Sequence, residues 1–208
     1  MDLSRPIAAV APGLHGGVLT VLVRTDRLLT GRAVASLVRP RASAAGVQRV
    51  LEDLVLQGLV MREGAGSAWL YSLNREHLAA DAVLSLSQIR DRMVTLLRDE
   101  VTSWATQPQS AVVFGSAVRG DGGPDSDIDI LLVRPDHGAQ PVEIWDQQVE
   151  RLAERVKKWT GNDADLLELS SDELSSDETR AVVAVARREG ILLAGRPLPR
   201  RSTAGVEA

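Results

Sequence analysis

The sequence predicts an α+β protein in which two folded units are joined by a long helix. Three observations lead to this prediction. Residues 1–78 contain helical patterns followed by two short β-prone runs around a glycine turn. Residues 79–106 repeat apolar side chains at helical spacing without glycine or proline, and residues 107–196 alternate strand patterns with helix patterns. Mixed patterns of this kind are typical of α+β proteins.

The composition excludes several classes of protein. Hydrophobic residues make up 44% of the 208 residues, which is enough to form a core. The chain contains no cysteine, so disulfides and thiolate metal sites are excluded. No apolar run approaches the roughly 20 residues that span a bilayer, and no signal peptide is recognisable. We therefore expect a soluble, cytoplasmic protein that makes no contact with a membrane.

The first unit, residues 1–78, is predicted to contain three helices. The first covers the apolar segment 14–23. Thr30 is a suitable N-cap for a second helix over residues 31–38. Ser43 is a suitable N-cap for a third helix, whose apolar side chains form one stripe and which ends at Gly58.

Two β-prone runs follow the third helix and predict a hairpin. Residues 59–63 and 68–73 flank a glycine-containing turn. Three helices followed by a hairpin resemble the winged helix-turn-helix of MarR- or ArsR-type regulators. The resemblance implies that the third helix enters the major groove of DNA and that the hairpin contacts the backbone. The residues that would then face DNA are Arg39, Arg41, Ser43, Gln48, Arg49 and Arg62.

The distribution of charge is compatible with two interpretations of this unit. Its formal net charge is positive, the remainder of the chain is negative, and the whole chain carries −4. A basic first unit favours DNA binding through phosphates. The alternative is a structural or dimerising module whose arginines are only solvated.

Residues 79–106 are predicted to form the connecting helix. Apolar residues recur at three- and four-residue spacing from Leu78 to Trp104, which is typical of an amphipathic helix. Such a helix can pack on both units and determine their relation. A homodimer in which this helix pairs with its copy is a further hypothesis.

The second unit, residues 107–196, is predicted to contain four strands and two long helices. Its strands are expected at residues 110–114, 127–133, 164–169 and 190–193, and its helices at residues 141–160 and 177–189. A short helix or turn is expected at residues 117–119. The polar residues 197–208 are expected to form a disordered tail.

Asp127 and Asp129 are the first candidate functional residues. Because side chains in a strand alternate between its two faces, these two carboxylates point the same way. Neighbouring carboxylates repel one another, so a cation is expected beside them. Carboxylate oxygens suit Mg²⁺ or Mn²⁺.

Gly115 and Ser116 are the second candidate site. Gly115 follows a buried strand and has no side chain, so a phosphate can approach its backbone. The helix start that follows offers free N–H groups to an anion. A phosphate site next to paired carboxylates indicates metal-dependent phosphoryl or nucleotidyl transfer.

The order of these motifs resembles the DNA polymerase β-type nucleotidyltransferase superfamily, and its minimal members most closely. The resemblance covers residues 110–195 and rests on Gly115-Ser116, on Asp127-Ile128-Asp129 and on Asp165 in a later strand. It implies a nucleotidyltransferase that moves NMP from an NTP to a hydroxyl. The acceptor would lie on a protein or a small molecule.

The resemblance also implies roles for individual residues. Asp127 and Asp129 would hold two Mg²⁺ ions, and Asp165 would hold one ion and orient or deprotonate the attacking hydroxyl. The phosphate-binding residues would be Gly115, Ser116, Arg119 and Ser126. Arg119 has an equally good interpretation as a surface arginine, and Asp163 is the alternative to Asp165 because it shares the same face.

Small members of this superfamily pair with helical toxins, and some transfer AMP to that partner. A DNA-binding regulator, or an autoregulated antitoxin with such a toxin as its partner, is therefore the alternative to a dedicated transferase.

Overall fold

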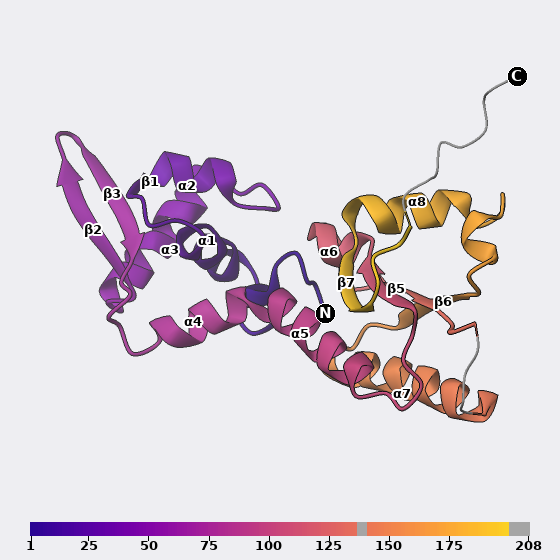
Figure 1. The fold of residues 1–208 in the computed structure, drawn as a ribbon. Coiled ribbons are helices and arrows are strands. Elements are labelled where there is room, and N and C mark those ends of the chain that lie inside the picture. Colours follow the sequence, from indigo (N-terminus) through magenta and orange to yellow (C-terminus); the bar gives the residue numbers. More distant parts are fainter. Residues whose placement is uncertain (137–140, 200–208) are drawn as a thin grey trace, which may run out of the picture. The chain divides into compact units, whose positions relative to one another are not determined.

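The computed structural model of the chain describes residues 1–136 and 141–199. The chain folds into two compact units, Met1–Arg90 and Asp91–Ala208, whose elements are labelled in Figure 1. Within the described ranges, no helix is both long enough and apolar enough to cross a bilayer. The boundary between the units falls inside residues 79–106, the segment predicted to be a connecting helix.

The first unit combines helices with a small antiparallel sheet. Its elements are the 3-10 helix η1 (Pro6–Ala9), α1 (Leu14–Val23), β1 (Leu29–Thr30), α2 (Gly31–Leu37), α3 (Ala44–Leu56), β2 (Val60–Ala65), β3 (Ala68–Leu73) and α4 (Ala80–Ser87). The strands lie in the order β1-β3-β2. The three expected helices and the hairpin are confirmed. The structure adds β1 and η1, which have two and four residues and are too short to leave a pattern in the sequence.

Both predicted helix caps are present. The Thr30 hydroxyl accepts a hydrogen bond from the backbone N–H of Ala33 at 3.1 Å. The Ser43 hydroxyl accepts one from the backbone N–H of Gly46, also at 3.1 Å. Each cap satisfies a backbone donor that has no partner inside its helix. The apolar face of α3 packs through Val47, Leu51 and other residues into the core of this unit.

The prediction of one continuous connecting helix is wrong. The segment forms α4 and α5 (Ile89–Thr102), and Gln88 between them has φ −96° and ψ 5°. Next to this break, the Ser87 hydroxyl donates to the Leu84 carbonyl at 2.6 Å. A serine that bonds to the backbone competes with the helical ladder, which favours an interruption. Before α4, which begins one residue after the expected start, the Asn74 amide donates to the Gly58 carbonyl at 2.9 Å.

The second unit is a four-stranded mixed sheet with helices on both faces. Its elements after α5 are β4 (Ser110–Phe114), α6 (Ser116–Arg119), β5 (Ile128–Val133), α7 (Val142–Thr160), β6 (Ala164–Leu169), the 3-10 helix η2 (Glu173–Ser175), α8 (Arg180–Glu189) and β7 (Ile191–Gly195). The strand order is β6-β5-β4-β7, with β5 and β6 parallel and the other pairs antiparallel. Figure 1 shows α7 and α8 on opposite sides of these strands.

The α8 face of the sheet carries an apolar core and, at one end, the candidate site. Val112, Leu131 and Val133 from the sheet pack with Val183 and Ala186 of α8. Asp129 has the same strand parity as Leu131 and Val133, so it belongs to this face.

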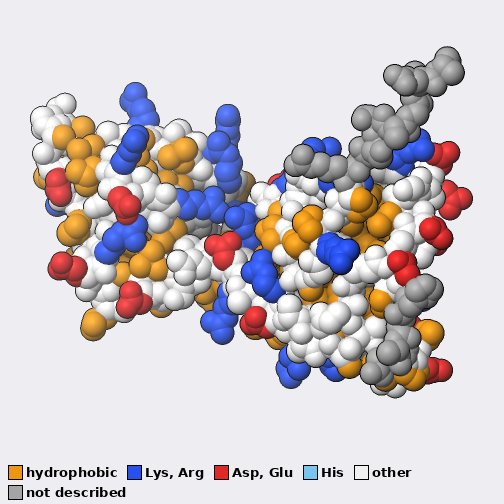
Figure 2. Space-filling model, in the orientation of Figure 1, with side chains coloured by type: hydrophobic (Ala, Val, Ile, Leu, Met, Phe, Trp, Pro, Cys, Tyr) orange, Lys and Arg blue, Asp and Glu red, His pale blue; other side chains and the backbone are white. Residues whose placement is uncertain are grey.

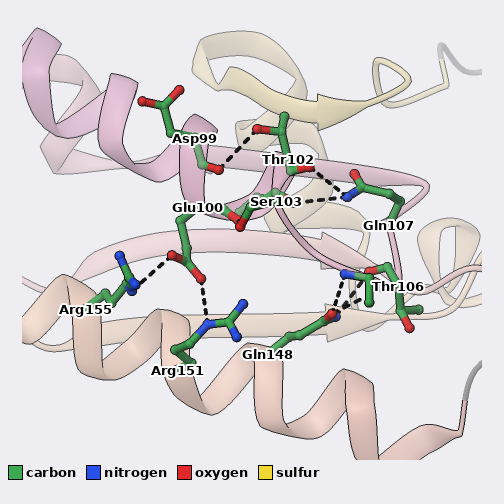
Figure 3. A network of polar contacts seen from close by, with 11 residues as sticks. Asp99, Glu100, Thr102, Ser103, Thr106, Gln107, Gln148, Arg151 and Arg155 are labelled. Carbon is green, nitrogen blue, oxygen red and sulfur yellow. Dashed lines mark hydrogen bonds and ion pairs between the residues drawn. The ribbon is translucent and has the colours of Figure 1, made fainter.

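A network of polar side chains joins α5 to α7 (Figure 3). The Glu100 side chain is only 4% exposed. Its carboxylate forms ion pairs with Arg151 at 2.8 Å and with Arg155 at 3.0 Å. Nearby, the Gln148 amide oxygen accepts from the backbone N–H groups of Ala105 and Thr106. These contacts place the end of α5 and the segment leading to β4 on α7.

The second residue of the predicted tail, residues 197–208, is packed. Leu198 is 6% exposed and belongs to the core on the α8 face. The prediction of disorder is therefore wrong at this position, because the apolar Leu198 side chain packs against the core of the second unit. The rest of that prediction, for residues 200–208, lies outside the described residues.

Candidate active site

The candidate site lies where β4 ends and β5 and β6 begin. In the antiparallel pair of β4 with β5, Asp129 lies opposite Phe114, the last residue of β4. In the parallel pair of β5 with β6, Asp129 is in register with Asp165. Directly paired residues present their side chains on the same face of a sheet. The sheet therefore brings Asp129 and Asp165 together from positions 36 residues apart in the sequence.

Asp127 lies one residue before β5, although the strand was predicted to begin there. It is exposed, and Asp129 is half-buried. The backbone N–H of Ile128, the next residue, donates to the Asp163 carbonyl at 2.9 Å. Asp127 is thus close to Asp129 in the sequence but is not itself held by the ladder of the sheet.

The environment of Asp129 is unfavourable to a negative charge. Burial raises the pKa of this carboxyl above its usual value, and the carboxylates of Asp165 and Asp127 raise it further. The Arg119 guanidinium acts in the opposite direction, although it does not outweigh them. All three aspartates of the candidate site therefore interact electrostatically at Asp129.

Gly115 is in direct contact with the Asp129 carboxylate. Its backbone angles, φ 72° and ψ −152°, belong to a region that only glycine adopts readily. A methyl group added at Gly115 would lie 2.0 Å from Asp129 Oδ2. The turn from β4 into α6 consequently runs against the carboxylate, which no larger residue would permit.

The loop between α6 and β5 folds back over Ser116. A Cβ atom at Gly122 would lie 2.8 Å from the Ser116 hydroxyl. The Ser126 hydroxyl accepts a hydrogen bond from the backbone N–H of Gly123 at 2.9 Å. Ser116 and Ser126, both predicted to bind phosphate, thus lie on the same loop system beside the aspartates, and Ser126 also has a role in the loop itself.

Arg119, also predicted to bind phosphate, forms ion pairs in this structure. Its Nε atom donates to Asp121 at 3.0 Å, and its Nη1 atom donates to Glu189 at the end of α8. These hydrogen bonds, the one to Asp121 first, raise the pKa of Arg119 above its usual value. Burial alone would raise the pKa of Glu189, but hydrogen bonds from Arg188 and Arg119 outweigh it and the pKa is lowered.

The two candidates for the third carboxylate differ in their surroundings. Asp163 forms an ion pair with Lys157 at 2.8 Å, and its side chain is 72% exposed. Asp165 pairs in register with Asp129 and contributes to the pKa of that residue. Of these two residues, Asp165 is therefore the one that lies beside Asp129 in the sheet.

Two residues next to the site were not singled out in the sequence. Asn162 donates from its side-chain amide to the carbonyls of Pro124 and Ser126 in the loop before β5. Glu189 binds Arg119. No local pattern could have identified either contact, because the partners are 36 to 70 residues apart.

In the part of the chain that the structure describes, no group of three or more His, Cys, Asp or Glu side chains is arranged to hold a metal ion. The donors themselves fit a hard divalent cation, since they are carboxylate oxygens that repel one another at Asp129. A cation bound there would offset this repulsion.

The residues predicted to face DNA differ in how far they are engaged in the first unit. Arg41 and Arg49 are exposed. Gln48 donates to Glu52 and to the Tyr71 hydroxyl, at 2.9 and 3.0 Å. Ser43 acts as a helix cap, Arg39 donates to the carbonyls of Ser36 and Val38, and Arg62 lies 4.7 Å over the Trp69 ring.

Basic side chains on the first unit are scattered on the face drawn in Figure 2. Acidic and apolar side chains lie among them on this face.

Comparisons with known proteins identify similarity in the second unit. Residues 93–183 match the family model described as nucleotidyltransferase domain. The comparison with curated proteins found no match.

Three solved structures illustrate the structural similarity. A mutant of the toxin–antitoxin MntA-HpeT is 21% identical, with 51% of this chain and 73% of that chain covered and a TM-score of 0.33. A toxin–antitoxin with AMP-PNP is 24% identical, with the same coverage and a TM-score of 0.32. A putative nucleotidyltransferase from Sulfolobus solfataricus is 25% identical, with 50% and 82% covered and a TM-score of 0.30. TM-scores this low support no inference about fold or function.

The similarity to the nucleotidyltransferase family is therefore carried by residues 93–183, the segment that contains β4, α6, β5, β6 and all three aspartates of the candidate site.

Proposed function

We propose that this protein is a metal-dependent nucleotidyltransferase that moves NMP from an NTP to a hydroxyl group on a protein or a small molecule. One observation carries the proposal most directly. The Asp129 carboxylate is in register with Asp165 on one side and in contact with Gly115 on the other. Carboxylates for a cation and a glycine turn for phosphates thus meet at one residue.

Asp127, Asp129 and Asp165 are the residues that would hold two Mg²⁺ or Mn²⁺ ions. When bound, such ions neutralise phosphate charge and lower the pKa of an attacking hydroxyl. The raised pKa of Asp129 supports this assignment, because a carboxylate crowded by two others is stabilised by a cation.

Gly115, Ser116 and the loop up to Ser126 are the proposed phosphate-binding elements. The absence of a side chain at Gly115 leaves its backbone open to the β- and γ-phosphates. The backbone N–H groups at the start of α6 and the Ser116 hydroxyl would donate to phosphate oxygens. Arg119 would add positive charge once it exchanges Asp121 or Glu189 for phosphate oxygens.

Asp165 is the proposed residue that orients the acceptor. It is exposed and lies on β6, the edge strand of the sheet. An acceptor hydroxyl can therefore reach Asp165 from solvent without displacing core side chains. Its carboxylate would position the hydroxyl and accept its proton.

A transfer assay tests this function. Full-length protein is incubated with labelled NTP, Mg²⁺ and candidate acceptors, and the label on protein or small molecule is counted. We expect Asp127→Asn/Asp129→Asn to abolish labelling, and Asp165→Asn to reduce it far more than Asp163→Asn. Equal labelling by the wild type and the Asp127/Asp129 variant would overturn the proposal. Equal losses in the two single variants would overturn only the choice of Asp165.

DNA binding by the first unit is a second candidate function. The element order α1-β1-α2-α3-β2-β3, with the sheet order β1-β3-β2, supports the winged helix-turn-helix hypothesis. The exposure of Arg41 and Arg49 at and before α3 is compatible with contacts to phosphates. A protein with both activities would suit an autoregulated antitoxin whose acceptor is its toxin partner.

A further inference from the structure

The turn between α7 and β6 contains a buried asparagine. Gly161 ends α7 in the left-handed conformation, with φ 75°. The next residue, Asn162, is only 5% exposed, and its backbone N–H donates to the Thr160 hydroxyl at 3.0 Å. The main chain of this turn is thus fixed locally, and the Asn162 side chain is directed into the protein and not toward solvent.

The Asn162 amide group bonds to the loop that precedes β5. Its Nδ2 atom donates to the Ser126 carbonyl at 2.7 Å and to the Pro124 carbonyl at 3.1 Å. Both partners are acceptors, so only the NH₂ side of the amide can satisfy them. Both contacts are made to the main chain, which makes them independent of the side chains in that loop.

A second connection runs between the same two segments. The backbone N–H of Ile128 donates to the Asp163 carbonyl at 2.9 Å. The bonds from Asn162 end at Ser126, and this bond begins at Ile128. Asp127 is the residue between them, and it lies outside the ladder of β5.

We infer that Asn162 is a positioning residue, which holds the loop at Ser126 and thereby places the Asp127 carboxylate beside Asp129 and Asp165. This inference rests on the proposed function, since it assigns Asn162 to the same metal and nucleotide site. Asn162 also leads directly into β6, the strand that carries Asp165. One side chain therefore links the segment of Asp127 to the segment of Asp165.

The chemistry of asparagine fits this role. An aspartate in the same place would turn carboxylate oxygens toward two carbonyl oxygens, which repel them. An alanine would leave both carbonyls without this donor, so both hydrogen bonds from the buried Asn162 side chain to the loop would be lost. Residues that orient metal ligands without touching the metal commonly change metal affinity or activity by about 10- to 100-fold when they are replaced.

The test compares Asn162→Asp and Asn162→Ala with the wild type and with Asn74→Asp. Asn74 is a matched control, because its amide also donates to a backbone carbonyl, that of Gly58, but in the first unit. Three quantities are measured on the full-length protein. They are hydrogen exchange of residues 121–127 without metal, Mn²⁺ binding followed by the EPR signal of free Mn²⁺, and kcat and KM for the NTP.

We expect both Asn162 variants to exchange faster in residues 121–127 and to bind Mn²⁺ about tenfold more weakly. We expect kcat to fall by about 10- to 100-fold and KM for the NTP to rise by a smaller factor, because the loss of the Asn162 bonds displaces Asp127 and the Ser126 end of the phosphate-binding loop, whereas Gly115 and Ser116 lie at its other end. Asn74→Asp is expected to leave all three quantities as in the wild type. If Asn162→Asp does not fold, the test rests on Asn162→Ala, because alanine places no negative charge next to the carbonyls of Pro124 and Ser126.

Folded variants with wild-type exchange, Mn²⁺ affinity and kcat would overturn the role of Asn162 and leave the transferase function intact. Equal losses in kcat and in the affinity for NTP would also overturn it, since they indicate a general loss of structure. A wild type that transfers no nucleotide would overturn the proposed function instead. The exchange of residues 121–127 would then still decide whether Asn162 holds this loop.

Discussion

Asp129 lies in an environment that disfavours its charged form. Burial and two neighbouring carboxylates raise its pKa, so the unfolded chain releases this proton more readily than the folded protein does. The contribution of Asp129 to the stability of the folded state is therefore fully present below the unfolded pKa, near 3.8. It is lost as the pH rises through the folded pKa. A carboxyl whose pKa is raised by folding lowers the free energy of unfolding at neutral pH.

We expect Asp129→Asn to raise the thermal midpoint of the metal-free protein at pH 7, because the amide carries no charge to desolvate. The difference from the wild type should vanish as the pH falls to about 3 and below, where the wild-type carboxyl is mostly protonated in both states. Thermal unfolding of both proteins from pH 3 to pH 8 measures the difference in their thermal midpoints. A variant that is less stable than the wild type at pH 7 would contradict the expectation.

Mg²⁺ bound beside Asp129 should offset the loss of stability that the charged carboxylate causes. A cation that binds only the folded state stabilises it by mass action. We expect Mg²⁺ to raise the thermal midpoint of the wild type at pH 7 and to leave that of Asp129→Asn nearly unchanged. The same shift in both proteins would show that Mg²⁺ binds elsewhere.

Gly115→Ala tests the close approach between the turn and the carboxylate. The added methyl group would combine backbone strain, about 1–3 kcal/mol, with an overlap at Asp129 Oδ2. Gly161→Ala is the matched control, since Gly161 also has a positive φ, of 75°, but nothing lies within 4 Å of its added methyl group. We expect urea unfolding to show a larger loss for Gly115→Ala than for Gly161→Ala. Equal losses would mean that the turn relaxes away from Asp129.

At the scale of elements, the contact of α5 with α7 depends on a buried carboxylate. Glu100 is enclosed, whereas the side chains of Arg151 and Arg155 are 47% and 50% exposed. Loss of Glu100 therefore leaves two cations that water can solvate, which reduces the usual cost of breaking a buried ion pair. The packing of α5 on α7 and not the charge alone should determine the remaining cost.

We expect Glu100→Gln to lower the free energy of unfolding by about 1–3 kcal/mol, below the range for pairs buried on both sides. Arg180→Ala serves as the comparison, since Arg180 pairs with Asp177 on the surface and such pairs contribute about 0–1 kcal/mol. Denaturant unfolding of both variants gives the two values. A loss for Glu100→Gln as small as that for Arg180→Ala would contradict the structural role of this network.

Local sequence signals explain which elements could be predicted. Thr30 and Ser43 cap α2 and α3 through hydrogen bonds that span three residues, so the motif and the structure lie in the same short segment. The break at Gln88 was missed because the apolar spacing continues through it. The Ser87 hydroxyl donates to the Leu84 carbonyl next to this break, a contact that the periodicity of apolar residues does not record.

At the scale of the whole molecule, the two units have separate cores. Separate cores allow changes on the surface of one unit without effects on the packing of the other. The candidate DNA-binding arginines and the candidate transfer site can therefore be altered independently.

We expect Arg41→Ala/Arg49→Ala to weaken DNA binding and to leave nucleotidyl transfer unchanged. If each arginine contacts one phosphate, each substitution reduces the slope of log K against log salt concentration by about 0.9. Gel shifts with the DNA upstream of the protein's own coding sequence, at several salt concentrations, measure the slope. Binding that is absent in the wild type, or insensitive to salt, would remove the DNA-binding hypothesis.

The sequence alone determined the features that depend on near neighbours. The helix caps at Thr30 and Ser43 and the turn at Gly115 after a buried strand are features of this kind. These properties follow from backbone geometry within a few residues. That Asp127 shares a face with Asp129 stays a prediction, because Asp127 precedes β5.

Only the tertiary structure decided which distant residues join them. Register between β5 and β6 places Asp165, and not Asp163, opposite Asp129. The bonds from Asn162 to the loop and from Arg119 to Glu189 likewise span 36 and 70 residues. Such contacts arise from the packing of α7 and α8 on the sheet, and no local pattern specifies where two distant segments will meet.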